Sequence, residues 1–115
     1  MEDKLAMDAM QIILNAGDAR TLTMSALKAL ESFDVEKANG LIKEAQLKIV
    51  EAHKVQTNAI QSEARGESFE YSVLFAHAQD TLMVINSEMN ISKKLIGMFS
   101  SIDERLANIE KQLSK

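Results

Sequence analysis

The amino-acid sequence has no cysteine and no proline, only 4 glycines among its 115 residues, and only 4% aromatic residues. Without cysteine the chain can form no disulfide framework, no thiolate nucleophile and no thiolate metal site. Because proline and glycine usually interrupt regular structure, their scarcity predicts few, long helices. The turn-rich, β-branched pattern of a β-sandwich or barrel is also missing.

Long apolar runs and clusters of basic residues are missing too. No run approaches the ~18–20 apolar residues of a membrane-spanning helix, so no membrane insertion is expected. The opening MEDKLAMDAM is too charged for the apolar region of a secretory signal. A net charge of −4 disfavours nucleic acid as a partner, because phosphate binding requires clustered Lys and Arg. These features favour a cytoplasmic protein with a single domain over residues 1–115.

The apolar residues that are present recur at helical spacing in the first half of the chain. One helix is expected over about residues 3–32, followed by a break at Ser32-Phe33-Asp34, with Asp34 as N-cap of the next helix. The second helix, about 35–65, carries a heptad seam that is apolar except for one glutamine. The seam consists of Ala38, Ile42, Ala45, Ile49, Ala52, Gln56 and Ala59.

A third helix is expected over about residues 70–113, after a break at Arg65-Gly66-Glu67-Ser68 in which Gly66 can adopt a left-handed conformation. Ser101 to Glu104 fits a capping box, which would allow a break there. The heptads run on without interruption through a C-terminal extension, about 100–115, and favour a continuous helix. Three long helices joined by short turns predict an all-α, antiparallel up-down-up hairpin.

Residues 73–85 of the third helix are apolar in every direction around the helix axis. A helix that is apolar all round is usually buried all round. One face of a three-helix hairpin must nevertheless meet solvent, so this segment predicts self-association. An unusually apolar surface strip is the alternative.

His77 and Asp80 interrupt this apolar segment, three residues apart and therefore one helical turn along. His77 is either a core histidine with a satisfied ring or a nucleophile or base. Asp80 needs compensation, because burying a lone carboxylate is costly. The basic candidates, Arg20, Lys54 and Arg65, are remote in sequence. If copies of Asp80 meet at a symmetry axis, a proton or a hard cation such as Mg²⁺ would relieve their repulsion.

The motifs of several other kinds of functional site are missing from the sequence. A di-iron bundle needs Glu-x-x-His motifs, and neither His53 nor His77 has a Glu three residues before it. The chain has no glycine-rich phosphate loop and no His-Glu-x-x-His motif.

Three separated stretches resemble one known family. They are His77-Ala78-Gln79-Asp80-Thr81-Leu82-Met83, Asn15-Ala16-Gly17-Asp18-Ala19-Arg20, and Glu51-Ala52-His53 with Gln56-Thr57. In their order and spacing, over about residues 5–99, they resemble the IIA component of the lactose/cellobiose/diacetylchitobiose family of the bacterial phosphoenolpyruvate-dependent sugar phosphotransferase system.

The resemblance implies a homotrimer of three-helix hairpins, nine helices with coiled-coil-like packing. It implies that His77 carries a phosphoryl group and that Asp80 of three subunits shares one divalent cation, expected to be Mg²⁺. The carrier protein HPr would donate to His77, and a cysteine of the IIB component would accept from it. Such a phosphotransferase component serves the uptake and phosphorylation of a β-linked disaccharide, whose identity is not encoded in IIA.

Four further residues are candidates for supporting this site. Gln79 and Gln56 can donate hydrogen bonds to the phosphoryl group, or can set the helix register. Gly17 permits a close helix approach near the site. Thr81 stands where the family often has histidine, which would affect transfer rate or partner preference. The alternative function is a structural or regulatory helical oligomer without phosphotransfer.

Overall fold

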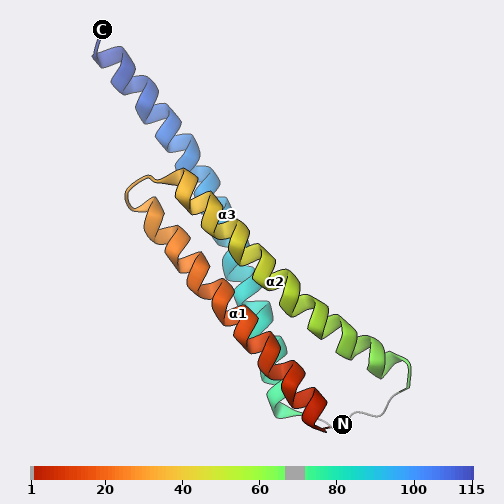
Figure 1. Ribbon diagram of the computed structural model, residues 1–115. Helices are drawn as coiled ribbons and strands as arrows, with labels where there is room; N and C mark the ends of the chain where they lie inside the picture. Colours follow the sequence, from red (N-terminus) through yellow and green to blue (C-terminus); the bar gives the residue numbers. More distant parts are fainter. Residues whose placement is uncertain (1, 67–71) are drawn as a thin grey trace.

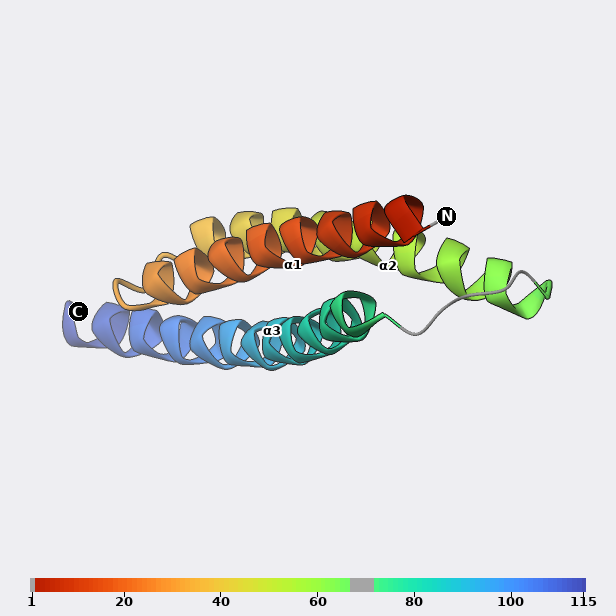
Figure 2. The same ribbon diagram turned by 90° about the horizontal axis from the view of Figure 1, so that it is seen from below.

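The structure is a computed structural model that describes residues 2–66 and 72–115. It contains three helices, α1 (Glu2–Leu30), α2 (Val35–Ala64) and α3 (Val73–Leu113), and no strand within those residues. The helices run up, down and up, with α1 and α2 side by side and α3 against this pair (Figure 1, Figure 2). The expected all-α hairpin is therefore confirmed, and α3 is continuous through Ser101–Glu104.

The turn between α1 and α2 is held by hydrogen bonds and by a ring contact. Asp34 Oδ1 accepts from the backbone N–H of Lys37 (3.1 Å), which confirms the expected N-cap. Phe33 adopts a left-handed φ of 56°, and its ring centroid lies 5.3 Å from that of Phe99 on α3. The contact fixes the α1–α2 turn against α3. The sequence gives no sign of this conformation, because positive φ is uncommon for a bulky residue.

The second break begins where it was expected. Gly66 follows the end of α2 with a φ of 86°, the left-handed conformation that glycine adopts without strain. Glu70, the expected start of the third helix, lies outside the described residues. Helix α3 begins at Val73, and its N-cap is Ser72, whose hydroxyl accepts from Phe75 N–H (3.1 Å).

The core consists of alanine and of branched or flexible aliphatic side chains. All the apolar members of the α2 seam are buried, as predicted, while Gln56 is half-buried. Small side chains let helix backbones approach closely, which explains how the core forms with so few aromatic residues. Its largest fully buried side chains are Ile12, Ile49, Leu82, Ile85 and Met89.

Two buried hydroxyls lie within this core without loss of hydrogen bonding. Thr23 Oγ1 donates to the Ala19 carbonyl, and Ser92 Oγ donates to the Glu88 carbonyl, both at 2.8 Å. No buried side-chain polar atom of the described residues lacks a partner. These hydrogen bonds therefore offset the cost of removing the two hydroxyls from water.

Candidate functional site

His77 lies near the beginning of α3, within the second turn after the Ser72 cap, and its side chain is exposed. Asp80 is exposed one turn further on, whereas Ala78 and Leu82 are fully buried. The interpretation of His77 as a core histidine is therefore wrong for the single chain. The helix turns Ala78 and Leu82 towards α1 and α2, which leaves His77 and Asp80 on its outer side.

None of the three basic residues considered as partners for Asp80 pairs with it. Arg20 contacts Glu88, Lys54 contacts Glu51, and Arg65 donates to Ser62 Oγ. Within the described residues, no group of three His, Cys, Asp or Glu side chains is arranged to hold a metal ion. One chain therefore supplies only the single carboxylate of Asp80 at this place.

Asp80 begins a stripe of exposed residues along the outer side of α3. At about 100° per residue, the side chains four, eleven and eighteen positions later return to nearly the same direction. These are Val84, Ile91 and Met98, which are 51%, 60% and 58% exposed. We call Asp80, Val84, Ile91 and Met98 the Asp80 stripe. As expected for a three-helix hairpin, one face of this apolar helix is exposed within one chain; self-association, the predicted cover, stays a prediction.

Gln56 and Gln79 bridge α2 and α3 beside the outer residues. Gln56 Nε2 donates to Gln79 Oε1 (3.2 Å), and both side chains are partly buried. The pair fixes the register of the two helices at the level of His77. The side-chain amide of Gln79 still has its own N–H groups as donors. Thr81, half-buried between Asp80 and Leu82, completes this turn of α3.

Gly17 and its neighbours on α1 do not form a close helix contact in the single chain. A Cβ built on Gly17 would meet no atom within 4 Å, so the predicted close approach is absent within one protomer. Gly17 is exposed and follows Met7, Met10 and Leu14 at heptad spacing, all three of them exposed as well. Helix α1 thus also presents an uncovered outer face.

Arg20 ties α1 to α3 through a bidentate contact that sequence reasoning missed. Its Nε and Nη2 donate to Glu88 Oε1 and Oε2 at 2.9 and 2.7 Å. The hydrogen bonds, assisted by the positive charge, lower the pKa of Glu88, and burial opposes them only in part. The hydrogen bond and charge of Glu88 raise the pKa of Arg20 in turn. The Arg20 end of the Asn15–Arg20 motif therefore holds the helices together.

His53 lies in a groove of about 470 Å³ that is lined entirely by one face of α2. Neither His77 nor Asp80 contributes to it. His53 is half-buried. The groove is thus separate from the outer residues of α3.

Comparison with known proteins gives the family. Residues 7–100 match the family described as "PTS system, Lactose/Cellobiose specific IIA subunit". The chain is 37% identical, over 103 residues, to the PTS system lactose-specific EIIA component of Lacticaseibacillus casei, covering 90% of this chain and 92% of that protein. Within residues 2–66 and 72–115, none of the helices is suited in length and apolarity to crossing a bilayer.

Two solved structures share the fold. The PTS cellobiose-specific enzyme IIA from Bacillus anthracis has a TM-score of 0.80 and 38% identity, covering 85% of this chain and 90% of that one. The IIA(Chitobiose) chain of a complex with HPr has a TM-score of 0.76 and 28% identity, covering 86% of this chain and 96% of that one. The match over residues 7–100, which include nearly all of the hairpin, places this chain in the lactose/cellobiose-specific IIA family of the sugar phosphotransferase system.

Proposed function

We propose that this IIA component is a cytoplasmic phosphocarrier that accepts a phosphoryl group from phospho-HPr on His77 and passes it to a cysteine of IIB. The observation that carries the proposal is the exposed position of His77 on α3, in the stretch that resembles the family's phosphorylated segment. A relative in the same family forms a complex with HPr. An exposed imidazole can meet two protein partners in succession.

The chemistry is two reversible transfers between side chains. In the first, a nitrogen of neutral His77 forms a bond to phosphorus while the phosphohistidine bond of HPr breaks, and the other ring nitrogen keeps its proton. In the second, the sulfur of the IIB cysteine forms the new bond and His77 is released. The transition state of such transfers is loose, so positioning and hydrogen bonds to the phosphoryl oxygens contribute most of the catalysis.

The surroundings of His77 are suited to this exchange. His77 lies about 60° around α3 from Asp80 and therefore beside the face that the proposed trimer covers. A partner protein docked over His77 would exclude water from the phosphoryl group and limit its hydrolysis. Thr81, four residues after His77, has its hydroxyl one turn along on the same side of α3, where it can donate to a phosphoryl oxygen. Gln79 lies two residues after His77 and is turned towards Gln56 on α2, so its proposed role is to fix the register of α3 beneath His77.

The proposed assembly is a homotrimer that covers the Asp80 stripe. Three copies of Asp80 around a threefold axis repel one another, and a divalent cation such as Mg²⁺, which prefers oxygen ligands, would offset that repulsion. Each chain offers one exposed carboxylate followed by apolar side chains, which fits such an axis. The cation would supply charge compensation for assembly and take no part in phosphoryl transfer.

The outer face of α1 supports the same assembly. Met7, Met10, Leu14 and Gly17 are exposed at heptad spacing, the arrangement by which one helix packs against another. At Gly17 a neighbouring backbone can approach closely because no side chain intervenes.

The test is to incubate the full chain with phosphoenolpyruvate, enzyme I and HPr and to follow its intact mass. We expect the gain of one phosphoryl group, its loss in mild acid, and no gain in His77→Ala, which remains folded because His77 is exposed. Adding IIB should then remove the group. A folded, trimeric chain that gains no mass would instead be a structural or regulatory oligomer. Relatives with this fold are named for lactose, cellobiose and chitobiose. The fold is therefore compatible with several sugars, and we propose that the membrane component selects the sugar.

A further inference from the structure

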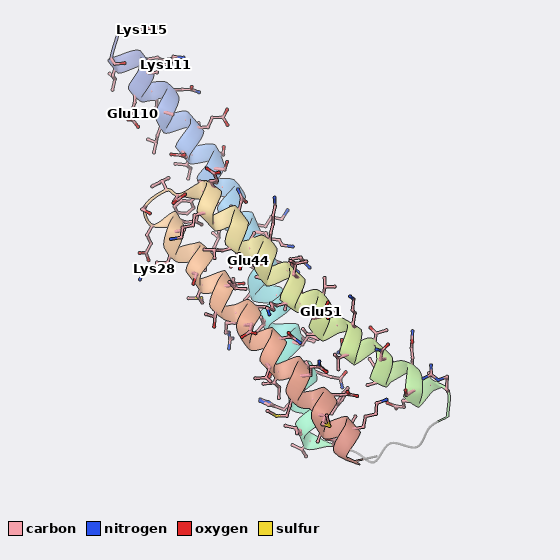
Figure 3. The ribbon with its side chains drawn as sticks, viewed as in Figure 1. Lys28, Glu44, Glu51, Glu110, Lys111 and Lys115 are labelled. Carbon is pink, nitrogen blue, oxygen red and sulfur yellow. The ribbon has the colours of Figure 1, made fainter. Side chains whose placement is uncertain are left out.

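The last turns of α3 lie beyond both the hairpin and the family match. The family match ends at residue 100, and every residue from Ser100 to Lys115 is exposed. This extension projects past the α1–α2 turn (Figure 1), with Glu110, Lys111 and Lys115 on it (Figure 3). The extension propagates from the packed part of α3 and needs no new helix nucleus, but its side chains gain no tertiary packing within one chain.

The apolar residues of the extension form a heptad seam. Leu106 and Leu113 take the a positions, and Ile102 and Ile109 take the d positions. Phe99, at the preceding a position, packs against Phe33 within the hairpin. From Ile102 onward the four seam residues are 44%, 42%, 52% and 82% exposed. Leucine at a combined with isoleucine at d favours three or four strands over two.

The d residues of the seam continue the Asp80 stripe, and the a residues Leu106 and Leu113 lie roughly 60–80° further around the helix. At about 100° per residue, Ile102 and Ile109 point within roughly 40° of the direction of Asp80 and Met98. Neighbouring copies that cover Val84 and Ile91 would therefore meet the seam of the extension without any change in the direction of α3.

We propose that the extensions of three copies wind into a parallel coiled coil, which prolongs the homotrimer beyond its helical hairpins. This inference rests on the proposed trimer. The apolar seam of each extension would be covered by the extensions of the other copies, aligned in the same direction and register.

The charges beside the seam select this parallel arrangement. Arg105 precedes the a residue Leu106, and Glu110 follows the d residue Ile109, so in a parallel coil Arg105 of one copy faces Glu110 of the next. In an antiparallel pair the two e positions would meet instead, and both are acidic, Asp103 and Glu110. Like charges at such positions destabilise the pair and opposite charges stabilise it.

The absence of native cysteine allows a direct test by single-cysteine variants of the full chain. Ile109→Cys places a thiol at the centre of the proposed coil. Lys111→Cys is the matched control, since two residues later the side chain points to the opposite side of the helix. On mild oxidation we expect Ile109→Cys to give disulfide-linked dimers, with the third copy of each trimer left unpaired.

The cross-linking rate of Ile109→Cys should exceed that of Lys111→Cys by on the order of a hundredfold to a thousandfold. Thiols that face one another at the coil axis have an effective concentration in the millimolar range, whereas thiols at position 111 point outwards and meet mainly between assemblies, at micromolar concentration. In the Ile109→Cys background, Arg105→Glu should slow cross-linking by placing two acids face to face. The exchange Arg105→Glu with Glu110→Arg should restore it.

Two results would overturn the inference. One is equal cross-linking of the two cysteine variants; the other is cross-linking that the charge exchange fails to restore. Light scattering and phosphoryl acceptance, measured on the same samples, separate this failure from that of the proposed function. A trimer that accepts phosphate on His77 without cross-linking at position 109 leaves the phosphocarrier intact and removes only the coiled coil.

Discussion

Two parts of α3 carry the same apolar periodicity but differ in what surrounds them. In residues 75–99 a buried side chain recurs every three or four positions, and Leu82 and Met89 are fully covered by α1 and α2. In residues 100–113 the same spacing continues with every side chain exposed. Periodicity therefore shows that a helix has an apolar face, but the topology of the hairpin decides whether that chain or another one covers it.

The largest effect on stability is expected when one aliphatic side chain is deleted from each of these two parts of α3 and the two variants are compared. Leu82→Ala leaves a cavity in the core and should destabilise the fold by about 2–5 kcal/mol. Ile109→Ala removes a half-exposed side chain and should leave the hairpin core unaffected. Native-state hydrogen exchange is the measurement. Leu82→Ala should speed exchange throughout α1 and α2, and Ile109→Ala only in the last turns of α3.

Equal acceleration of exchange in α1 by the two variants would contradict the comparison. It would mean that the extension contributes to the stability of the hairpin itself.

The Asp80 stripe can be tested through its one charge. In Asp80→Asn the amide is neutral, so copies meeting at an axis no longer repel and the trimer should no longer require a divalent cation. Sedimentation velocity with and without chelator is the measurement. The wild type should dissociate in chelator and Asp80→Asn should stay trimeric; dissociation of both to the same extent would rule out the role proposed for Asp80.

A smaller effect is expected at Gly17 on the outer face of α1. Alanine is favoured over glycine inside a helix by about 0.5–1 kcal/mol, and the added Cβ meets no atom within 4 Å in the single chain. Gly17→Ala should therefore raise the thermal unfolding temperature slightly. Gly17→Leu should preserve helicity by circular dichroism yet weaken the trimer in light scattering. Trimers of unchanged stability in Gly17→Leu would exclude a close approach at this position.

The smallest effect concerns the contact between Arg20 and Glu88. The folded state lowers the pKa of Glu88, so the contact stabilises the fold above the ordinary glutamate pKa and is lost as the pH falls through the folded-state pKa. Both side chains are about half exposed, at 50% and 44%, and solvent screens their interaction.

We expect Glu88→Gln to lower the urea midpoint slightly at pH 7 and to match the wild type in acid, below the folded-state pKa. A difference that persists unchanged in acid would show that the carboxylate charge is not what stabilises the contact.

Much of the hairpin was readable from the sequence because it depends on local chemistry. The α2 seam, the Asp34 cap and the left-handed Gly66 follow from residue type and spacing within a few positions. The fully buried positions Ala78, Leu82, Ile85 and Met89 also follow a regular pattern of four and three. This pattern of buried positions leaves His77 on the outer side of α3. The sequence did not make this evident, because the residues next to His77 are apolar as well.

The contacts between helices could not be predicted from local sequence patterns. Arg20 and Glu88 are separated by 68 positions, and several other acidic residues could have been the partner until the register of α1 against α3 was known. Gln56 and Gln79 were identified individually as donors, whereas their hydrogen bond to each other depends on the same register. Phe33 adopts its unusual φ beside Phe99 on another helix.

The rod-like outline of the chain has a consequence for how its assembly is measured. The structure extends over 71 × 21 × 17 Å with a radius of gyration of 19.1 Å, whereas a compact domain of this length has about 13 Å. Frictional drag on such a particle exceeds that on a sphere of equal mass. A single chain would leave a gel-filtration column early and resemble a dimer on a globular calibration curve. Mass photometry or multi-angle scattering, which weigh the particle rather than its drag, are therefore the appropriate way to count its copies.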